Sequence, residues 1–175
     1  MAIIIALSAL AATNSFAQYN EIKSENIASL QVVAGNNWLS MPIATLNGEA
    51  INISFDDLTH EYHRYAYRLQ HCEADWSVSE GIFESDYCEG FADGSTIDDI
   101  EESLNTNTLY THYRLSIPNE NCRIKMSGNY RLTVYDENEG DTVFTACFMV
   151  VEPLVKTSMA VTTNTDIDTN KAHQQ

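Results

Sequence analysis

Gly128-Asn129-Tyr130-Arg131-Leu132-Thr133-Val134 is the stretch that decides the fold. Tyr130, Leu132 and Val134 alternate with polar residues, which predicts a strand with one buried face. A Gly-x-Tyr sequence that opens an alternating strand is typical of β-sandwich domains, where the tyrosine hydroxyl often tethers a corner. The stretch therefore predicts a sandwich that is immunoglobulin-like in the broad sense.

Six further segments have the pattern or composition of short strands, and turn residues separate most of them. They span residues 30–33, 43–46, 49–55, 62–72, 110–117 and 142–151. Asn47-Gly48 and residues 136–141 supply tight turns between neighbouring strands. Residues 142–151 are apolar on both faces, which indicates a central or covered strand. Since no segment shows a sustained helical period, we expect an all-β, antiparallel β-sandwich of about seven strands.

Residues 73–109 do not fit this pattern, because they are polar and only weakly periodic. A compact domain rarely holds so long a loop without structure, so part of it must pair or pack. Five apolar side chains are available to anchor it: Trp76, Ile82, Phe83, Tyr87 and Phe91. Residues 98–104 could form one or two helical turns. We expect an Ω-like insertion over one end of the sandwich, and we expect it to carry the main contact region.

The net charge is −16, from 25 acidic and 9 basic residues. This charge repels phosphate, so nucleic acid and an anionic membrane surface are unfavourable partners. A basic protein surface or a cation would be attracted. The alternative interpretation is that the acidity serves solubility alone.

The N-terminus indicates export. Residues 2–12 form an uncharged apolar run that is too short to span a bilayer, and Ser15-Phe16-Ala17 offers a signal peptidase its small residues. We interpret residues 1–17 as a signal peptide cleaved before Gln18, although no Lys or Arg precedes the apolar run. No Cys follows the cleavage site, so a lipid anchor is not expected. The mature chain should be soluble in an exported compartment.

Four cysteines are present, and none belongs to a C-x-x-C pair. They are Cys72, Cys88, Cys122 and Cys147. A zinc site built on close pairs is therefore not supported. An oxidising compartment would permit disulfides with three possible pairings, and free buried thiols are the alternative.

Two segments have weak metal-site patterns. His60 and His63 lie near Asp56, Asp57 and Glu61, but their spacing separates them on a strand. Asp136-x-Asn138-x-Gly140-Asp141 has oxygen ligands at calcium-loop spacing but lacks the distal Glu. We expect a strand lead-in and a hairpin turn at these places, with no metal bound.

The chain shows no other sign of catalysis. It has no G-x-S-x-G elbow and no glycine-rich phosphate loop, and no carboxylate pair stands out as acid and base. Trp38 and Trp76 could form a sugar-binding platform, but core aromatics are the simpler interpretation. We therefore expect a binding or structural protein without enzyme activity or cofactor.

Several segments have a more specific character. Residues 53–58 read I-S-F-D-D-L, residues 67–76 read Y-R-L-Q-H-C-E-A-D-W and residues 87–91 read Y-C-E-G-F. Residues 104–106 read L-N-T and residues 110–120 read Y-T-H-Y-R-L-S-I-P-N-E. Residues 127–130 read S-G-N-Y and residues 148–152 read F-M-V-V-E. In this order and spacing, from about residue 30 to residue 152, the segments resemble the N-terminal domain of the type IX secretion system plug protein family.

The resemblance implies a β-sandwich without enzyme activity in the periplasm of Bacteroidetes-type bacteria. Its implied partner is the very large outer-membrane β-barrel translocon (SprA-type), whose periplasmic opening it seals when no cargo passes. Neither a small-molecule substrate nor insertion into the membrane is implied. The alternatives are an exported carbohydrate-binding or adhesive sandwich module and a small hydrolase with an unrecognised site.

Family members are about twice this length or more, with a further β-rich region. The resemblance thus predicts a signal peptide at 1–17, a flank at 18–29, the plug domain at 30–153 and a linker at 154–175. That linker would lead to a C-terminal region absent here. Although Cys88 lies within the Y-C-E-G-F segment, neither Cys88 nor Cys147 is a residue associated with the family motifs, so a disulfide between them would be particular to this chain.

Overall fold

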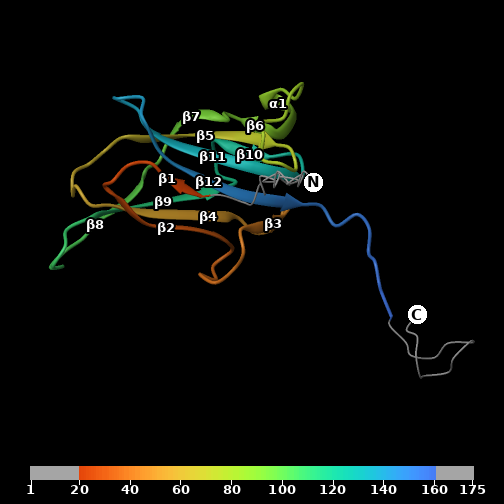
Figure 1. The fold of residues 1–175 in the computed structure, drawn as a ribbon, viewed down its shortest axis with the longest axis horizontal. Coiled ribbons are helices and arrows are strands. Elements are labelled where there is room, and N and C mark those ends of the chain that lie inside the picture. Colours follow the sequence, from red (N-terminus) through yellow and green to blue (C-terminus); the bar gives the residue numbers. More distant parts are fainter. Residues whose placement is uncertain (1–19, 161–175) are drawn as a thin grey trace, which may run out of the picture.

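Two facing sheets form the body of the molecule in the computed structural model, which describes residues 20–160 (Figure 1). The first sheet has the order β1-β12-β11-β5-β7, with β3 also paired to β12. Its strands are β1 (Glu21–Ile22), β3 (Ile43–Thr45), β5 (Tyr65–Cys72), β7 (Asp93–Thr96), β11 (Gly128–Asp136) and β12 (Thr142–Val151). The second sheet has the order β2-β4-β9-β8. Its strands are β2 (Ile27–Ala34), β4 (Ile51–Asp57), β8 (Asp99–Glu102) and β9 (Thr111–Ile117).

All the pairings within these sheets are antiparallel except that of β3 with β12. The expected all-β, antiparallel sandwich is thereby confirmed. β12 lies between β11 on one side and β1 and β3 on the other, so the central position expected from its sequence is confirmed. β1 and the start of β2 precede residue 30, where the domain was expected to begin. The proposed signal peptide, residues 1–17, lies outside the described residues.

The core is built from the inward positions of the alternating strands. β4 and β9 bury every second residue, as their sequence pattern predicts. Phe55 is completely buried at the centre, stacked on Tyr113 with ring centroids 5.1 Å apart and edge-on to Phe144 at 4.8 Å. Burial of such a side chain contributes roughly 1.5–3 kcal/mol, so this aromatic group joins the two sheets strongly.

The Gly-x-Tyr sequence forms the expected corner at the start of β11. The hydroxyl of Tyr130 donates a hydrogen bond to the carbonyl oxygen of Met126 at 2.6 Å. A side chain at Gly128 would collide with the imidazole of His71 on β5, the neighbouring strand. Glycine is therefore required for the close approach, and the tyrosine hydroxyl fixes the chain just before it.

Residues 73–109 are an integral part of the sandwich. They contain a short helix, α1 (Glu84–Tyr87), and three strands, β6 (Cys88–Gly90), β7 and β8. β6 pairs with β10 (Cys122–Ile124) in a separate two-stranded ribbon. β7 extends the first sheet beyond β5, and β8 extends the second sheet beyond β9.

The crossing from β7 to β8 takes only two residues. Ile97, the first of them, is 2% exposed and donates its amide hydrogen to the carbonyl oxygen of Tyr65. The segment therefore passes from one sheet to the other and closes one side of the sandwich. The expectation that it must pair or pack is confirmed.

The expected helical turns at residues 98–104 are wrong, because Asp99–Glu102 is strand β8. The physical reason is the open edge of β9, whose backbone groups need partners. Arg114 of β9 adds ion pairs with Asp99, at 3.7 Å, and with Glu101. A local pattern cannot reveal this long-range pairing.

Candidate functional site

The segment 73–109 is also the most acidic part of the chain. It contains eleven Asp and Glu residues and no Lys, Arg or His, so it accounts for −11 of the net charge of −16. Four of these carboxylates pair with arginines: Asp93 with Arg68, Asp99 and Glu101 with Arg114, and Glu89 with Arg123. Within residues 20–160, the other seven have no basic side chain within ion-pair distance. The segment thus presents an uncompensated negative surface.

Exposed aromatic side chains accompany this charge in the α1–β6 segment, which we define as residues 80–91. Phe83 is 75% exposed and Phe91 is 70% exposed, at either end of α1 and β6. Glu80, Glu84 and Glu89 are exposed in the same segment. Aromatic side chains within a polar rim are typical of the centres of protein–protein interfaces.

Tyr87 is the anchor of the α1–β6 segment. Its ring is buried, and its hydroxyl donates a hydrogen bond to the carbonyl oxygen of Leu69 at 3.1 Å. Burial, followed by the charge of Glu84, raises the pKa of Tyr87 to about 12. Ile82 packs partly against the core and Trp76 is half-buried. Of the five expected anchors, Phe83 and Phe91 do not serve, because their side chains project into solvent.

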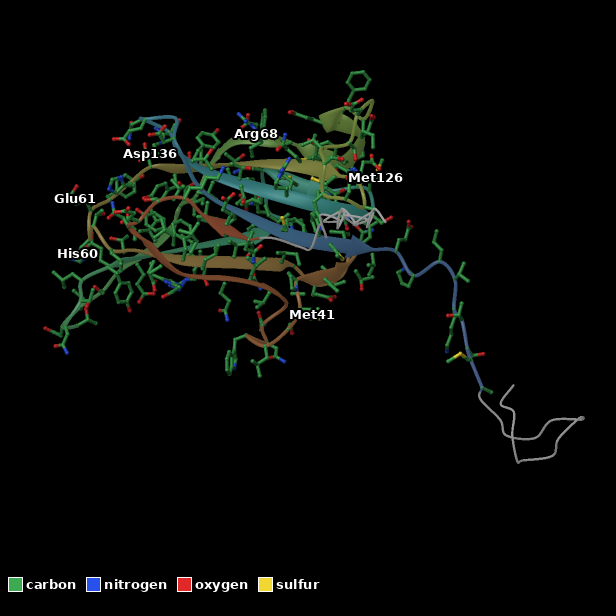
Figure 2. The ribbon with its side chains drawn as sticks, in the orientation of Figure 1. Met41, His60, Glu61, Arg68, Met126 and Asp136 are labelled. Carbon is green, nitrogen blue, oxygen red and sulfur yellow. The ribbon has the colours of Figure 1, made fainter. Side chains whose placement is uncertain are left out.

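A polar cluster lies at the other end of the sandwich, near His60, Glu61 and Asp136 in Figure 2. Nδ1 of His63 lies 3.2 Å from Oδ2 of Asp136, and its Nε2 lies 3.8 Å from Oδ2 of Asp57. Asp57 is fully buried and accepts a hydrogen bond from the hydroxyl of Tyr65 at 2.9 Å. The two weak metal-site segments therefore meet in space.

The cluster brings together side chains from separate strands. Nδ1 of His63 is within hydrogen-bond distance of Asp136, whereas Nε2 lies near Asp57 without a hydrogen-bond partner among the described residues. One imidazole thus lies between β4, the lead-in to β5 and the end of β11. His60 does not take part, because its Nδ1 lies 3.3 Å from the carbonyl oxygen of Tyr110. An open polar pocket of about 440 Å³ lies beside the cluster. Among residues 20–160, no group of three His, Cys, Asp or Glu side chains has the geometry of a metal site.

Residues 136–141 form the expected hairpin turn. Oδ1 of Asp136 accepts hydrogen bonds from the amides of Asn138, at 2.7 Å, and Glu139, at 3.2 Å. Burial alone would raise the pKa of Asp136, but the Asn138 amide, His63 and the Glu139 amide together hold it below its usual value. The carboxylate that looked like a calcium ligand therefore caps its own turn.

Trp38 does not lie in the core, so that interpretation is wrong. It is 69% exposed on the loop between β2 and β3, together with Leu39 and Met41, and Figure 2 shows the loop that carries Met41 projecting from the second sheet. Asn36-Asn37 turns the chain away from the sheet before Trp38. That turn signal was visible in the sequence and could have placed this tryptophan outside.

The comparisons with known proteins agree with the fold. A family model described as the type 9 secretion system plug protein first domain matches residues 27–152. The chain belongs to this family. It is not a known enzyme family. No curated protein shows significant similarity to the chain.

A solved structure gives a second comparison. The crystal structure of a hypothetical protein from Parabacteroides merdae ATCC 43184 superposes with a TM-score of 0.76 at 46% sequence identity. The match covers 90% of this chain and 40% of that protein. The plug-family domain thus corresponds to less than half the length of this relative.

One apolar pocket of the plug-family domain lies near the point where the chain leaves the sandwich. It has a volume of about 180 Å³ and is lined by Ala44, Leu46, Ile117, Ile124 and Val150, among others. Val150 belongs to β12, the last strand, after which residues 152–160 run exposed and without regular structure. Within residues 20–160, no helix has the length and apolar character needed to cross a membrane.

Proposed function

We propose that this domain docks on the periplasmic opening of the outer-membrane type IX secretion translocon, a SprA-type barrel, and seals it when no cargo passes. The observation that supports the proposal most directly is the family match over residues 27–152. The protein would be exported by residues 1–17 to the periplasm of a Bacteroidetes-type bacterium. It would act by binding alone, without catalysis or cofactor.

The α1–β6 segment is the proposed contact region. It combines exposed Phe83 and Phe91 with three exposed glutamates, while Tyr87 fixes its backbone to the core. Such a surface suits a basic rim with apolar recesses, because charge speeds the encounter and buried aromatics hold the complex. A plug must also leave when cargo arrives, so an affinity of about −8 to −10 kcal/mol, micromolar or somewhat tighter, serves best.

A pull-down from periplasm and detergent-solubilised outer membrane tests the docking. With the folded domain as bait, mass spectrometry should identify a very large outer-membrane barrel among the captured proteins. Failure to capture it, while a longer family member succeeds, would show that this domain alone does not dock.

Charge reversal tests the contact region. The triple variant Glu80→Lys, Glu84→Lys, Glu89→Lys should lose capture. The control variant Glu61→Lys, Glu139→Lys, Asp141→Lys has the same net charge but places the changes at the polar-cluster end, so it should bind. Equal capture of both variants would refute this location. An association rate that does not change with added salt would exclude electrostatic steering.

An exported carbohydrate-binding or adhesive module is the second candidate. Exposed Trp38 favours it, since a solvent-exposed indole can stack on a sugar ring. Trp38 does not line the apolar pocket described above. Tryptophan fluorescence should change on addition of glycans if this candidate is correct, and the change should vanish in Trp38→Ala.

A further inference from the structure

Cys88 and Cys122 come together in the two-stranded ribbon. Cys88 begins β6 and Cys122 begins β10, and their Sγ atoms lie 2.8 Å apart. In the antiparallel register, Cys88 is opposite Ile124 and Cys122 is opposite Gly90, so the cysteines are diagonal neighbours on one face. That face is turned to the core, where their exposures are 3% and 0%.

The ribbon is held in this geometry by a close backbone approach. Gly90 has φ +108°, a conformation that favours glycine, and a side chain there would collide with the carbonyl of Asn121. The amide of Phe91 also donates a hydrogen bond to that carbonyl oxygen. β6 and β10 therefore cannot separate or shift locally without breaking the contacts that keep the two sulfur atoms adjacent.

The other two cysteines lie on the opposite face of the first sheet. Cys147 lies between Ala146 and Phe148, whose side chains are in the core, so it points outward. Cys72 is opposite Asn129, next to the core residue Tyr130, and it points outward as well. The sheet thus separates this pair from Cys88 and Cys122.

Cys72 and Cys147 are also poorly placed for a bond with each other. Cys72 lies on β5 and Cys147 on β12, with β11 between them. Two strand spacings separate their backbones by about 10 Å, beyond the roughly 7 Å that a disulfide spans. A disulfide between Cys88 and Cys122 therefore does not require a second one between Cys72 and Cys147.

We propose that Cys88 and Cys122 form a disulfide in the exported protein. The inference rests on the proposed exported location, because the bond needs a thiol-oxidising protein that carries its own disulfide. One cysteine thiolate attacks that disulfide, forming a mixed disulfide and releasing one thiolate of the oxidant. The second cysteine, as its thiolate, then attacks the mixed disulfide, so that two protons and two electrons in total pass to the oxidant, which leaves as a dithiol.

The bond would close a loop that contains β7, β8 and β9. It would tie the α1–β6 segment to the body of the sandwich beside the corner before β11. Burial raises the pKa of both thiols, so neither is readily ionised after folding. The disulfide should therefore form before the core closes, and it should resist thiol reductants while the protein stays folded.

Mass spectrometry of the protein exported to an oxidising periplasm tests the proposal. After denaturation and alkylation without reductant, the digest should contain a cross-linked peptide pair joining Cys88 to Cys122, and neither of these two residues should be alkylated. Alkylation of both Cys88 and Cys122, or a cross-link from either of them to Cys72 or Cys147, would overturn the inference. This measurement uses the native chain and does not depend on whether a variant folds.

Stability gives a second readout. Cys88→Ser should lower Tm by about 10 °C in oxidised protein, since a loop of this length is constrained in the unfolded state. Cys147→Ser, the control, should keep both the Cys88–Cys122 cross-link and the stability that the cross-link gives. Equal Tm values for Cys88→Ser and the native chain, or loss of the Cys88–Cys122 cross-link in Cys147→Ser, would refute the pairing. A failed translocon pull-down would not change the masses of the cross-linked peptides, so the two proposals are tested separately.

Discussion

Deletion of the Tyr130 hydroxyl is the sharpest test of the corner at the start of β11. Tyr130→Phe keeps the buried ring, which stacks on Phe148 with centroids 5.5 Å apart. It removes only the 2.6 Å hydrogen bond to the Met126 carbonyl oxygen. Burial raises the pKa of Tyr130, so the hydroxyl remains a donor across the usable pH range.

The expected cost follows from what the substitution leaves behind. A typical hydrogen bond contributes roughly 0.5–1.5 kcal/mol, and an acceptor left without a donor adds to this loss when it is shielded from water. Met126 is partly buried against the core, so we expect about 1–2 kcal/mol. For a domain of this size the loss lowers Tm by roughly 2–8 °C.

Urea denaturation followed by circular dichroism measures this cost, with the m-value as a check that the two folded states bury equal surface. Tyr62→Phe is the matched control, because the same atom is removed from a side chain that is 63% exposed. The control should change stability by less than about 0.5 kcal/mol. If Tyr130→Phe were no more destabilising than the control, the corner bond would have no role in stability.

Three further predictions concern the core, the ribbon and the hairpin turn. Phe55→Ala removes the ring between the two sheets and should cost about 3–5 kcal/mol, measured as a lower urea midpoint. Gly90→Ala should be severely destabilising because of its φ and the Asn121 carbonyl, whereas Gly81→Ala, which meets open space, should cost only about 1 kcal/mol by thermal melting. Asp136→Asn should flatten the pH dependence of stability: since the folded pKa of Asp136 is lowered, its contribution is present above the unfolded value near 3.8 and is lost as the pH falls through the folded value. Parallel unfolding free energies for both proteins between pH 3 and pH 6 would contradict that assignment.

The long strands could be predicted from the sequence because their burial alternates along the chain. In β4, β9 and β11 the inward residues are apolar or aromatic except at the strand ends, where Asp57, Thr111 and Asp136 are buried, and a period of two is a local signal. The Gly-x-Tyr corner was equally local, since donor and acceptor are four residues apart. These features need no knowledge of partners elsewhere in the chain.

The features that were missed depend on distant contacts. β7 and β8 are four residues each, and their strand character comes from the open edges of β5 and β9. The His63–Asp136 contact joins positions 73 residues apart and could not be seen from spacing. The proposed contact region depends on surface chemistry, which no periodicity encodes.

The sheet-to-sheet crossing at Ile97 has a consequence for solubility. Without β7 and β8, the strands β5 and β9 would present long unpaired edges, which are templates for intermolecular strand addition. The two capping strands are short, and β8 carries Asp99, Glu101 and Glu102, so its outer edge repels another copy of itself. An acidic border of this kind disfavours edge-to-edge aggregation. Deletion of the segment would remove that protection together with the proposed docking surface.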